Sequence, residues 1–307
     1  MDRPKIAVLM STYNGEKYIR EQIDSILAQK DVDVTLYIRD DGSSDETRNI
    51  ILEYVRQNGN IHLYFDGRNL RPGASFLKLL CFAAKYKGPF DYYAFSDQDD
   101  IWLEEKLIRG IRSIEDIDGP ALYCSNQRIY KNGEELGLRF DEPPEITLLS
   151  NLSSNKMYGC TMVFNNELAQ LVRKVRKPGK DYLYIRNHDA WTILLAFAVG
   201  KVVYDHDSYI LYRIHDNNVV GIREVSFCER AVRFMHKTVK NLRSNSARYV
   251  LRALGDADFA DRDYVELMAY YRNDLKTRLK LIKNADRFKT EKESRFVFIV
   301  KVLLVYI

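Results

Sequence analysis

The stretch YYAFSDQDD, residues 92–100, places a run of strand-forming apolar residues directly before a cluster of carboxylates. The cluster is Asp97-Gln98-Asp99-Asp100, and three carboxylates within four residues repel one another. Such a cluster is tolerated where a cation or several hydrogen-bond donors lie beside it, and carboxylate oxygens suit Mg²⁺ or Mn²⁺. A solvated acidic turn that begins the next helix is the simpler alternative. The position at the end of a central strand favours the metal site.

The sequence on the N-terminal side predicts that this strand belongs to a parallel sheet. Residues 5–11, KIAVLMS, form an apolar run without polar alternation, as a strand covered on both faces requires. Residues 16–29 carry apolar side chains at helical spacing. Further strands are expected at 34–39, 61–65 and 92–96, and further helices at 45–58 and 75–86. This alternation predicts an α/β fold with ligands bound at the carboxyl ends of the strands.

Beyond residue 100 the pattern is mixed. Strands are expected at 121–130, 157–165 and 202–212, and helices at 103–114, 166–175 and 188–198. From residue 227 onward the pattern is helical and basic, so we expect a domain boundary near residues 220–226. The chain from Arg223 onward carries a net charge of +8, whereas the preceding residues carry −4. The two parts are therefore expected to have different partners.

Two further polar clusters follow predicted strands. Asp40-Asp41-Gly42-Ser43-Ser44-Asp45 could bind a ribose or a base through its carboxylates, although an ordinary loop with a helix cap is the simpler explanation. Ser11-Thr12-Tyr13-Asn14-Gly15 lacks the pattern GxGxxG, and the chain also lacks GxxxxGK[ST]. These absences argue against a dinucleotide-binding Rossmann fold and against a P-loop nucleotidase.

The cysteines and the overall hydropathy indicate a cytoplasmic protein. Cysteines stand at positions 81, 124, 160 and 228 without CxxC spacing, so reduced and buried thiols are expected. The start of the sequence has no signal-peptide pattern, and no apolar run reaches the length of about 18 residues that a membrane-spanning helix needs.

Together these motifs resemble those of family 2 glycosyltransferases with the GT-A fold, and in particular those of bacterial rhamnosyltransferases and related capsule or cell-wall polysaccharide transferases. They are STYNGEKY (11–18), RDDGSSDET (39–47), the stretch 69–76, SDQDDIW (96–102), YGCTMVFN (158–165), HDAW (188–191) and YRIHDNNVVG (212–221). The resemblance implies a GT-A catalytic domain over residues 1–222, whose nucleotide-sugar half is about 1–100 and whose acceptor half is about 101–222. A basic helical extension, 223–307, would follow.

The resemblance also implies roles for individual residues. Those expected to bind the nucleotide sugar are Thr12, Tyr13, Asn14, Asp40, Asp41, Asp97 and Gln98, with Asp41 on the base. Asp99 and His215 are expected to hold the divalent cation, while Asp97 acts on the ribose or through water. Asp189 is expected to be the catalytic general base. Those expected near the acceptor or the donor sugar are Trp102, Gly159, Cys160, His188 and Trp191.

The implied activity is inverting, metal-dependent transfer of L-rhamnose from dTDP-rhamnose onto a lipid-linked or growing cell-surface polysaccharide. Such an enzyme needs a cation to stabilise the leaving nucleoside diphosphate and a carboxylate base, which is worth roughly 10²- to 10⁴-fold in rate. The alternatives are a UDP-hexose or UDP-N-acetylhexosamine donor and, in a different class, a non-catalytic nucleotide-sugar-binding protein. Nucleic-acid binding is not expected, because the acidic cluster would repel a phosphate backbone and no base-reading motif is present.

The basic tail leaves two kinds of partner open. Residues 227–253 are basic and partly amphipathic, and residues 296–307 are apolar except for Lys301 but too short to span a bilayer. These segments could lie on the cytoplasmic face of the inner membrane, drawn there by apolar burial and by anionic lipid. Alternatively they pack on the catalytic domain or form a homodimer contact.

Overall fold

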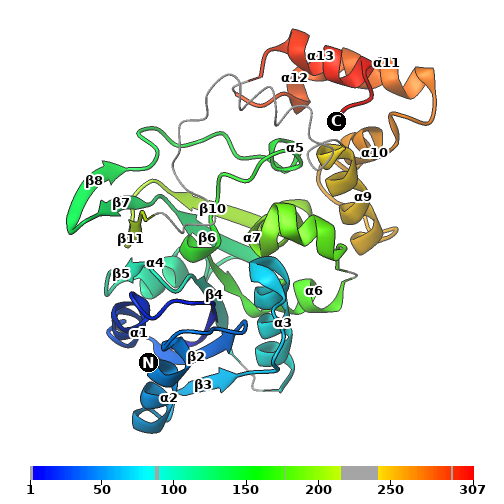
Figure 1. The fold of residues 1–307 in the computed structure, drawn as a ribbon. Coiled ribbons are helices and arrows are strands. Elements are labelled where there is room, and N and C mark those ends of the chain that lie inside the picture. The colour runs from blue at the N-terminus through cyan, green and yellow to red at the C-terminus, as the bar shows by residue number, and fades with distance from the viewer. Residues whose placement is uncertain (1–2, 87–89, 176, 216–240, 292) are drawn as a thin grey trace.

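The computed structural model describes residues 3–86, 90–175, 177–215, 241–291 and 293–307. At its centre is a seven-stranded sheet in the order β10-β6-β9-β4-β1-β2-β3 (Figure 1). Its strands in chain order are β1 (Lys5–Thr12), β2 (Asp33–Asp40), β3 (Ile61–Tyr64), β4 (Tyr92–Ser96), β6 (Ala121–Ser125), β9 (Val163–Asn165) and β10 (Lys201–Asp205). The neighbouring pairs are parallel except those of β9, which is antiparallel to both β4 and β6. The predicted α/β fold with a mostly parallel sheet is confirmed.

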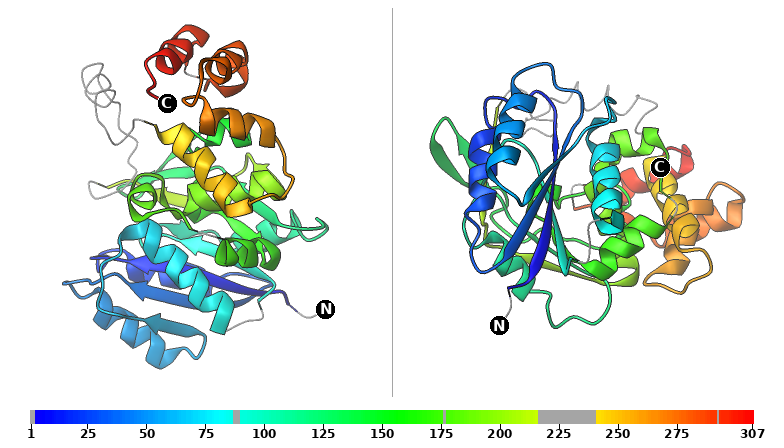
Figure 2. Two further views of the ribbon diagram at one scale, coloured as in Figure 1. Left: turned by 90° about the vertical axis from the view of Figure 1, so that its right-hand side faces the viewer. Right: turned by 90° about the horizontal axis from the view of Figure 1, so that it is seen from below.

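Strand β1 shows why its sequence is an unbroken apolar run. Ala7 and Leu9 belong to one apolar core, Ile6, Val8 and Met10 belong to another, and all five are fully buried. The helices that cover the first face are α3 (Arg71–Tyr86), α6 (Asn166–Lys174) and α7 (Lys180–Val199). Those that cover the second are α1 (Ile19–Leu27), α2 (Thr47–Gln57) and α4 (Lys106–Arg112). Figure 2 shows the sheet between these two helical layers.

A second, four-stranded sheet corrects two predicted strands. Its order is β5-β11-β7-β8, from β5 (Ile101–Trp102), β7 (Arg128–Lys131), β8 (Glu134–Leu138) and β11 (Ile210–Arg213). The strand expected at 121–130 is therefore two strands in different sheets, β6 and β7, and that expected at 202–212 divides into β10 and β11. The first break falls at Asn126, whose buried amide donates to the carbonyl of Phe140 at 2.7 Å. This side chain pairs with another segment of backbone and ends the strand.

The strand expected at 157–165 is also shorter than predicted. Only β9 is extended, and a 3₁₀ turn over Gly159–Thr161 precedes it. The hydroxyl of Thr161 donates to the carbonyl of Tyr158 at 2.8 Å, which holds the turn closed. This turn matters below because it delivers two site residues.

The C-terminal residues are helical, as predicted. They form α9 (Leu242–Leu254), α10 (Arg262–Tyr270), α11 (Leu275–Lys283), α12 (Ala285–Phe288) and α13 (Arg295–Leu303). Val250, Met268 and Phe298 belong to the same apolar core as α7. The helices form a layer at the end of the molecule opposite α2, shown in yellow, orange and red in Figure 1. The predicted boundary at 220–226 and the tail segment 227–240 lie outside the described residues.

None of the described helices is long and apolar enough to cross a membrane. Cys81, Cys124 and Cys160 are free thiols, as expected from their spacing, and Cys228 lies outside the described residues. Cys124 and Cys160 are buried, whereas Cys81 is only partly so.

Candidate active site

The carboxylates that follow β4 gather at the carboxyl end of the parallel strands. Asp100 is fully buried, and Asp97 and Asp99 are partly buried. Burial raises the pKa of Asp97 to about 7, with further contributions from the charges of Asp99 and Asp189. Burial and the charges of Asp99 and Asp97 raise the pKa of Asp100 well above its ordinary value. The ionised forms of these carboxyl groups are therefore destabilised by burial and by one another, and a bound cation would stabilise them.

A segment more than 100 residues later in the chain contacts this cluster. The Nε2 atom of His215 lies 2.8 Å from Oδ2 of Asp99, and its ring stacks on Tyr18 with centroids 4.9 Å apart. The backbone amide of Arg213, at the end of β11, donates to Oδ1 of Asp100 at 3.2 Å, and its Nε donates to the carbonyl of Asp99 at 2.8 Å. The β11 strand is therefore fastened to the acidic turn, and it brings an imidazole nitrogen to a carboxylate oxygen.

The antiparallel strand β9 brings Cys160 to the same place. Because Ala94 of β4 pairs with Val163 of β9, the residues before β9 lie at the carboxyl end of β4. The thiol of Cys160 and the carboxylates of Asp97 and Asp100 present atoms that all lie within 4.8 Å of one another. No sequence pattern suggests this grouping, since it depends on the direction of one short strand.

The donor set fits a divalent cation. Two sets of candidate ligands lie at the turn: the pair Asp99 and His215, and the group of Asp97, Asp100 and Cys160. Oδ2 of Asp100 is buried without a hydrogen-bond partner among the described residues. Oxygen-rich sets with one imidazole suit Mg²⁺ or Mn²⁺, and a thiol is better suited to softer metals. The two predicted ligands, Asp99 and His215, are in direct contact with each other.

Asp189 is positioned by a break in helix α7. The helix is continuous in outline, but Asn187 has φ 59° and ψ −180°, so the chain restarts a helix at His188. The expected helix at 188–198 is thus the second half of a longer element. Oδ1 of Asp189 accepts from the amide of Ala190 at 2.7 Å, and Oδ2 accepts from the amide of Gly159 at 3.3 Å. Burial raises the pKa of Asp189 to about 6 despite these donors.

His188 and the two tryptophans lie in the interior. The His188 ring stacks on Phe76 with centroids 3.8 Å apart and meets Phe95 edge-on, and burial lowers its pKa to about 3, so it is neutral. Trp191 is fully buried in the apolar core. Trp102 is buried beneath the ammonium of Lys106, which lies 3.7 Å from the ring centroid. Of the five residues predicted near the sugar or acceptor, only Gly159 and Cys160 contact the acidic residues.

The loops after β1, β2 and β4 are tied together by side-chain amides. Gln98 accepts from the amide of Tyr13 at 2.8 Å and donates to its carbonyl at 3.1 Å. Asn14 accepts from the amide of Ser44 at 2.9 Å, which joins the first loop to the second. Thr12 donates to Asp40 at 3.4 Å, and the Tyr13 ring stands half exposed beside these loops. These predicted nucleotide-binding residues are therefore brought together at one edge.

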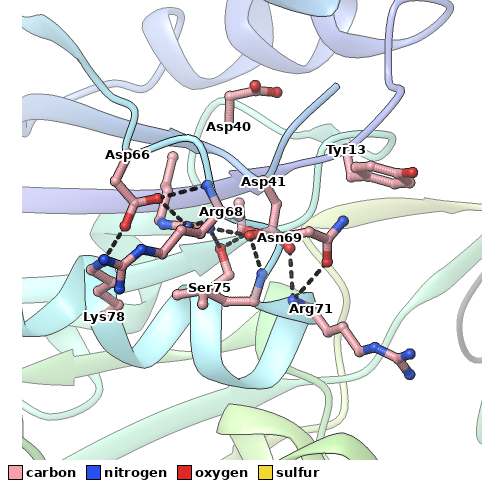
Figure 3. Close-up of polar contacts among 12 residues, drawn as sticks. Tyr13, Asp40, Asp41, Asp66, Arg68, Asn69, Arg71, Ser75 and Lys78 are labelled. Atoms are coloured by element: carbon pink, nitrogen blue, oxygen red, sulfur yellow. Dashed lines mark hydrogen bonds and ion pairs between the residues drawn. The ribbon is translucent and has the colours of Figure 1, made fainter. Parts of the chain in front are cut away.

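Asp41 points into a buried ionic cluster (Figure 3). Its carboxylate pairs with the fully buried Arg39 and accepts from the backbone amides of Leu70 and Arg71 at 2.8 and 2.7 Å. Arg39 also pairs with Asp66 at 2.7 Å. Burial alone would raise the pKa of Asp66, but hydrogen bonds from Lys78 and Arg39 lower it to about 2.

Sequence patterns do not single out Arg39, Asp66 or Lys78. The available signal is Arg39 itself, a cation next to the largely apolar stretch 34–38 of the same strand. Asp40, by contrast, accepts from the amide of Ser43 and from Arg48 at 3.1 Å.

Comparisons with known proteins agree with this arrangement. The family described as "Glycosyl transferase family 2" matches residues 7–174. A dTDP-rhamnosyl transferase RfbG of Shigella flexneri is 33% identical over 216 residues, which are 69% of this chain and 73% of the relative. An uncharacterized glycosyltransferase RP339 of Rickettsia prowazekii is 27% identical over 69% of this chain and 64% of its own length.

Solved structures share the fold. Residues 1–349 of TarS from S. aureus, in complex with UDP, superpose with a TM-score of 0.58 at 17% identity, covering 92% of this chain and 80% of that one. A mannosyltransferase of Pyrobaculum calidifontis in complex with GDP-Man and Mn²⁺ gives 0.54 at 13% identity, covering 99% and 81%. The chain therefore belongs to glycosyl transferase family 2 and has the GT-A fold.

Proposed function

We propose that this protein is an inverting, metal-dependent transferase that moves one sugar from a nucleoside diphosphate sugar to a hydroxyl of a saccharide acceptor. The observation that carries the proposal is the position of Asp189 beside the acidic turn. Asp189 has a pKa raised to about 6 and lies close enough to Asp97 to raise the pKa of that carboxyl as well. A poised carboxylate beside a cation site is what base-assisted displacement of a diphosphate requires.

The nucleotide would bind across the loops after β1 and β2. Thr12, Tyr13, Asn14, Asp40 and Asp41 are the proposed nucleotide contacts, with Gln98 and Asp97 extending toward the sugar. The half-exposed ring of Tyr13 offers a stacking surface for a base. Asp41 already accepts three hydrogen bonds, so it would meet a base only through a remaining lone pair. The solved relatives with UDP, UDP-GlcNAc and GDP-Man support a nucleotide-sugar donor.

Asp99 and His215 would hold the cation, Mg²⁺ or Mn²⁺, with Asp97 acting through water or the ribose. A cation bound there would offset the charge that develops on the leaving nucleoside diphosphate. Arg213 keeps the acidic turn in place through its contacts with Asp99 and Asp100. The mannosyltransferase of Pyrobaculum calidifontis was solved as a complex with Mn²⁺, which supports a metal requirement.

Asp189 would take the proton from the acceptor hydroxyl as that oxygen attacks the anomeric carbon. The amides of Gly159 and Ala190 fix the carboxylate and leave it ionised at neutral pH. One base and one displacement invert the anomeric centre. His188, buried and neutral, would hold the restarted helix against Phe76 and would not take the proton.

The preferred donor is dTDP-rhamnose, supported by the relative from Shigella flexneri. The alternative is a UDP-hexose or UDP-N-acetylhexosamine, supported by the TarS structure with UDP-GlcNAc. The acceptor would be a lipid-linked or growing polysaccharide at the cytoplasmic side of the membrane.

Calorimetry with dTDP-rhamnose, UDP-galactose, UDP-glucose and UDP-N-acetylglucosamine, each with Mn²⁺ and with EDTA, separates these donors. Metal-dependent binding of dTDP-rhamnose is expected. If one donor binds but no nucleoside diphosphate is released in the presence of any saccharide acceptor, the non-catalytic alternative would be favoured.

A further inference from the structure

The outward face of α13 is apolar where a surface helix is ordinarily polar. Phe296 is 74% exposed and Leu304 62% exposed, and Val297 and Leu303 are exposed with them. These residues recur at helical spacing, so they share one side of the helix. The opposite side, with Phe298 and Val302, is fully buried in the core. The helix is therefore apolar both toward the protein and toward solvent, and contiguous exposed apolar surface marks an interaction site.

Helix α11 adds a second exposed apolar pair with lysines around it. Leu275 and Leu279 lie one turn apart and are 67% and 55% exposed. Lys276, Lys280 and Lys283 are exposed on the same helix. Long lysine side chains can place their ammonium groups at a polar boundary while their stems cover apolar surface. Helices α11 and α13 contact each other in the outer layer of the molecule (Figure 2).

This layer has a net positive charge. Residues 275–307 contain nine Lys/Arg and three Asp/Glu. Each of the three acidic side chains already has a basic partner: Asp286 pairs with Arg295, Glu291 with Lys156 and Glu293 with Arg243. The excess positive charge is thus available to an anionic partner.

We propose that α11 and α13 form a docking surface for a bilayer that contains anionic phospholipid. The apolar side chains would enter the boundary between headgroups and acyl chains, and the α11 lysines would meet the phosphates. A second copy of this chain fits less well, because a symmetric contact would bring the lysines of both copies together.

The C-terminal helices pack against the preceding part of the molecule and share its apolar core. Tyr182 of α7 donates to Ser246 of α9 at 3.0 Å, and Lys156 pairs with Glu291 at 2.5 Å. These contacts connect the helical layer to α7, which also carries Asp189 beyond its break at Asn187. Bringing Asp189 near the bilayer is useful only if the proposed function holds, since the acceptor would then be linked to a lipid in that bilayer. The lipid binding itself does not depend on it.

Vesicle flotation tests the surface with the full chain. Binding is compared on vesicles of phosphatidylglycerol with phosphatidylcholine and on vesicles of phosphatidylcholine alone. We expect Phe296→Ser/Leu303→Ser/Leu304→Ser to weaken binding to anionic vesicles on the order of 100-fold. Lys276→Gln/Lys280→Gln/Lys283→Gln should weaken it by a similar factor, and about 0.5 M salt should mimic that loss. Circular dichroism and thermal unfolding confirm that each variant is folded.

Matched controls use exposed residues elsewhere. Leu136→Ser/Leu138→Ser on β8 and Lys131→Gln/Lys174→Gln/Lys201→Gln should leave flotation unchanged. Wild-type protein that stays unbound to anionic vesicles, or an α13 variant that still floats, overturns the proposal. If the wild type sediments as a dimer and the α13 variant as a monomer, while flotation is the same for both, the face would be assigned to a second copy instead. Calorimetry with donor on the same samples separates the outcomes, because lipid binding without donor binding refutes the proposed function alone.

Discussion

The carboxylate of Asp41 accepts a hydrogen bond from the backbone amide of Arg71 at 2.7 Å, and so caps helix α3 from the end of strand β2. The same carboxylate holds Arg39, which has no exposed surface. Asp41, which is expected to contact the base of the nucleotide, therefore also connects the end of a strand to the start of a helix. The two roles make different predictions for its removal.

Asp41→Ala should lower the free energy of unfolding by about 3 kcal/mol, because the buried Arg39 loses one of its two carboxylate partners. Urea unfolding measures the change. Asp33→Ala, at the exposed start of the same strand, should change stability by less than about 0.5 kcal/mol. A variant as stable as the wild type that no longer binds nucleotide would show that Asp41 serves the base and not the helix.

Asp189→Asn should keep donor binding and lose turnover by about 10²- to 10⁴-fold. The amide oxygen can still accept from Gly159 or Ala190, so the local structure is kept while the base is lost. Donor affinity by calorimetry and turnover by nucleoside diphosphate release give the two values. Asp181→Asn, in the exposed first turn of the same helix, is the matched control and should retain full turnover. Unchanged turnover in Asp189→Asn would remove the base assignment.

Turnover at saturating donor should rise with pH through about 6 and level off above about 7. The pKa of Asp189 is raised to about 6, and only the ionised carboxylate can accept the acceptor proton. Below about pH 6 the rate should fall about tenfold for each unit. A pH-rate profile measured with saturating Mn²⁺ tests this. A midpoint of about 4 would indicate a base with an ordinary carboxyl pKa and therefore a different residue.

His215→Ala and Asp99→Ala should weaken Mn²⁺-dependent nucleotide binding. Outer-sphere partners of metal ligands are worth about 10- to 100-fold in affinity, and direct ligands should cost at least as much. Isothermal titration of Mn²⁺ in the presence of nucleoside diphosphate gives the affinities. His206→Ala, in the turn between β10 and β11, should leave them unchanged. Full transfer activity in EDTA would contradict the metal requirement itself.

Gly73→Ala should impair turnover although residue 73 is in α3 and outside the acidic cluster. A Cβ there would collide with the carbonyl oxygen of Leu183 and lie 3.1 Å from Cα of Asn187, where α7 breaks before Asp189. The expected result is a lower rate with donor affinity retained, together with reduced thermal stability. Gly59→Ala is the control, because a Cβ at Gly59 meets nothing within 4 Å. Equal rates for the two variants would show that α7 tolerates displacement at its break.

The fold could be predicted because its signals are local. An apolar run such as residues 5–11 is stable as a strand only when both of its faces are buried. The helical spacing in residues 16–29 predicts the helix that covers one of these faces. The acidic turn at 97–100 is visible for the same reason, since it interrupts such a run. The site roles of Asp99, His215 and Asp189 stay predictions.

The remaining features depend on contacts between distant segments. Cys160 meets Asp97 only because β9 is antiparallel, and no pattern in three strand residues fixes a direction. His188 looks like a polar site residue, yet Phe76 and Phe95 enclose its ring. The strand expected at 121–130 divides at Asn126 because that amide finds Phe140 fourteen residues away. In each case a partner far along the chain decides the outcome.

The apolar core that runs from the central sheet through α7 into α9, α10 and α13 limits how this protein can be shortened. The family match ends at residue 174, but a chain cut there would lose α7, which packs on α3 in the core. A chain cut before residue 241 would keep α7 but expose its Tyr182, which packs on Tyr249 of α9. Such a fragment should aggregate and say little about catalysis or lipid. Truncation is therefore unsuited to separating the activities of this chain, and point substitutions on its outer surface are the suitable tool.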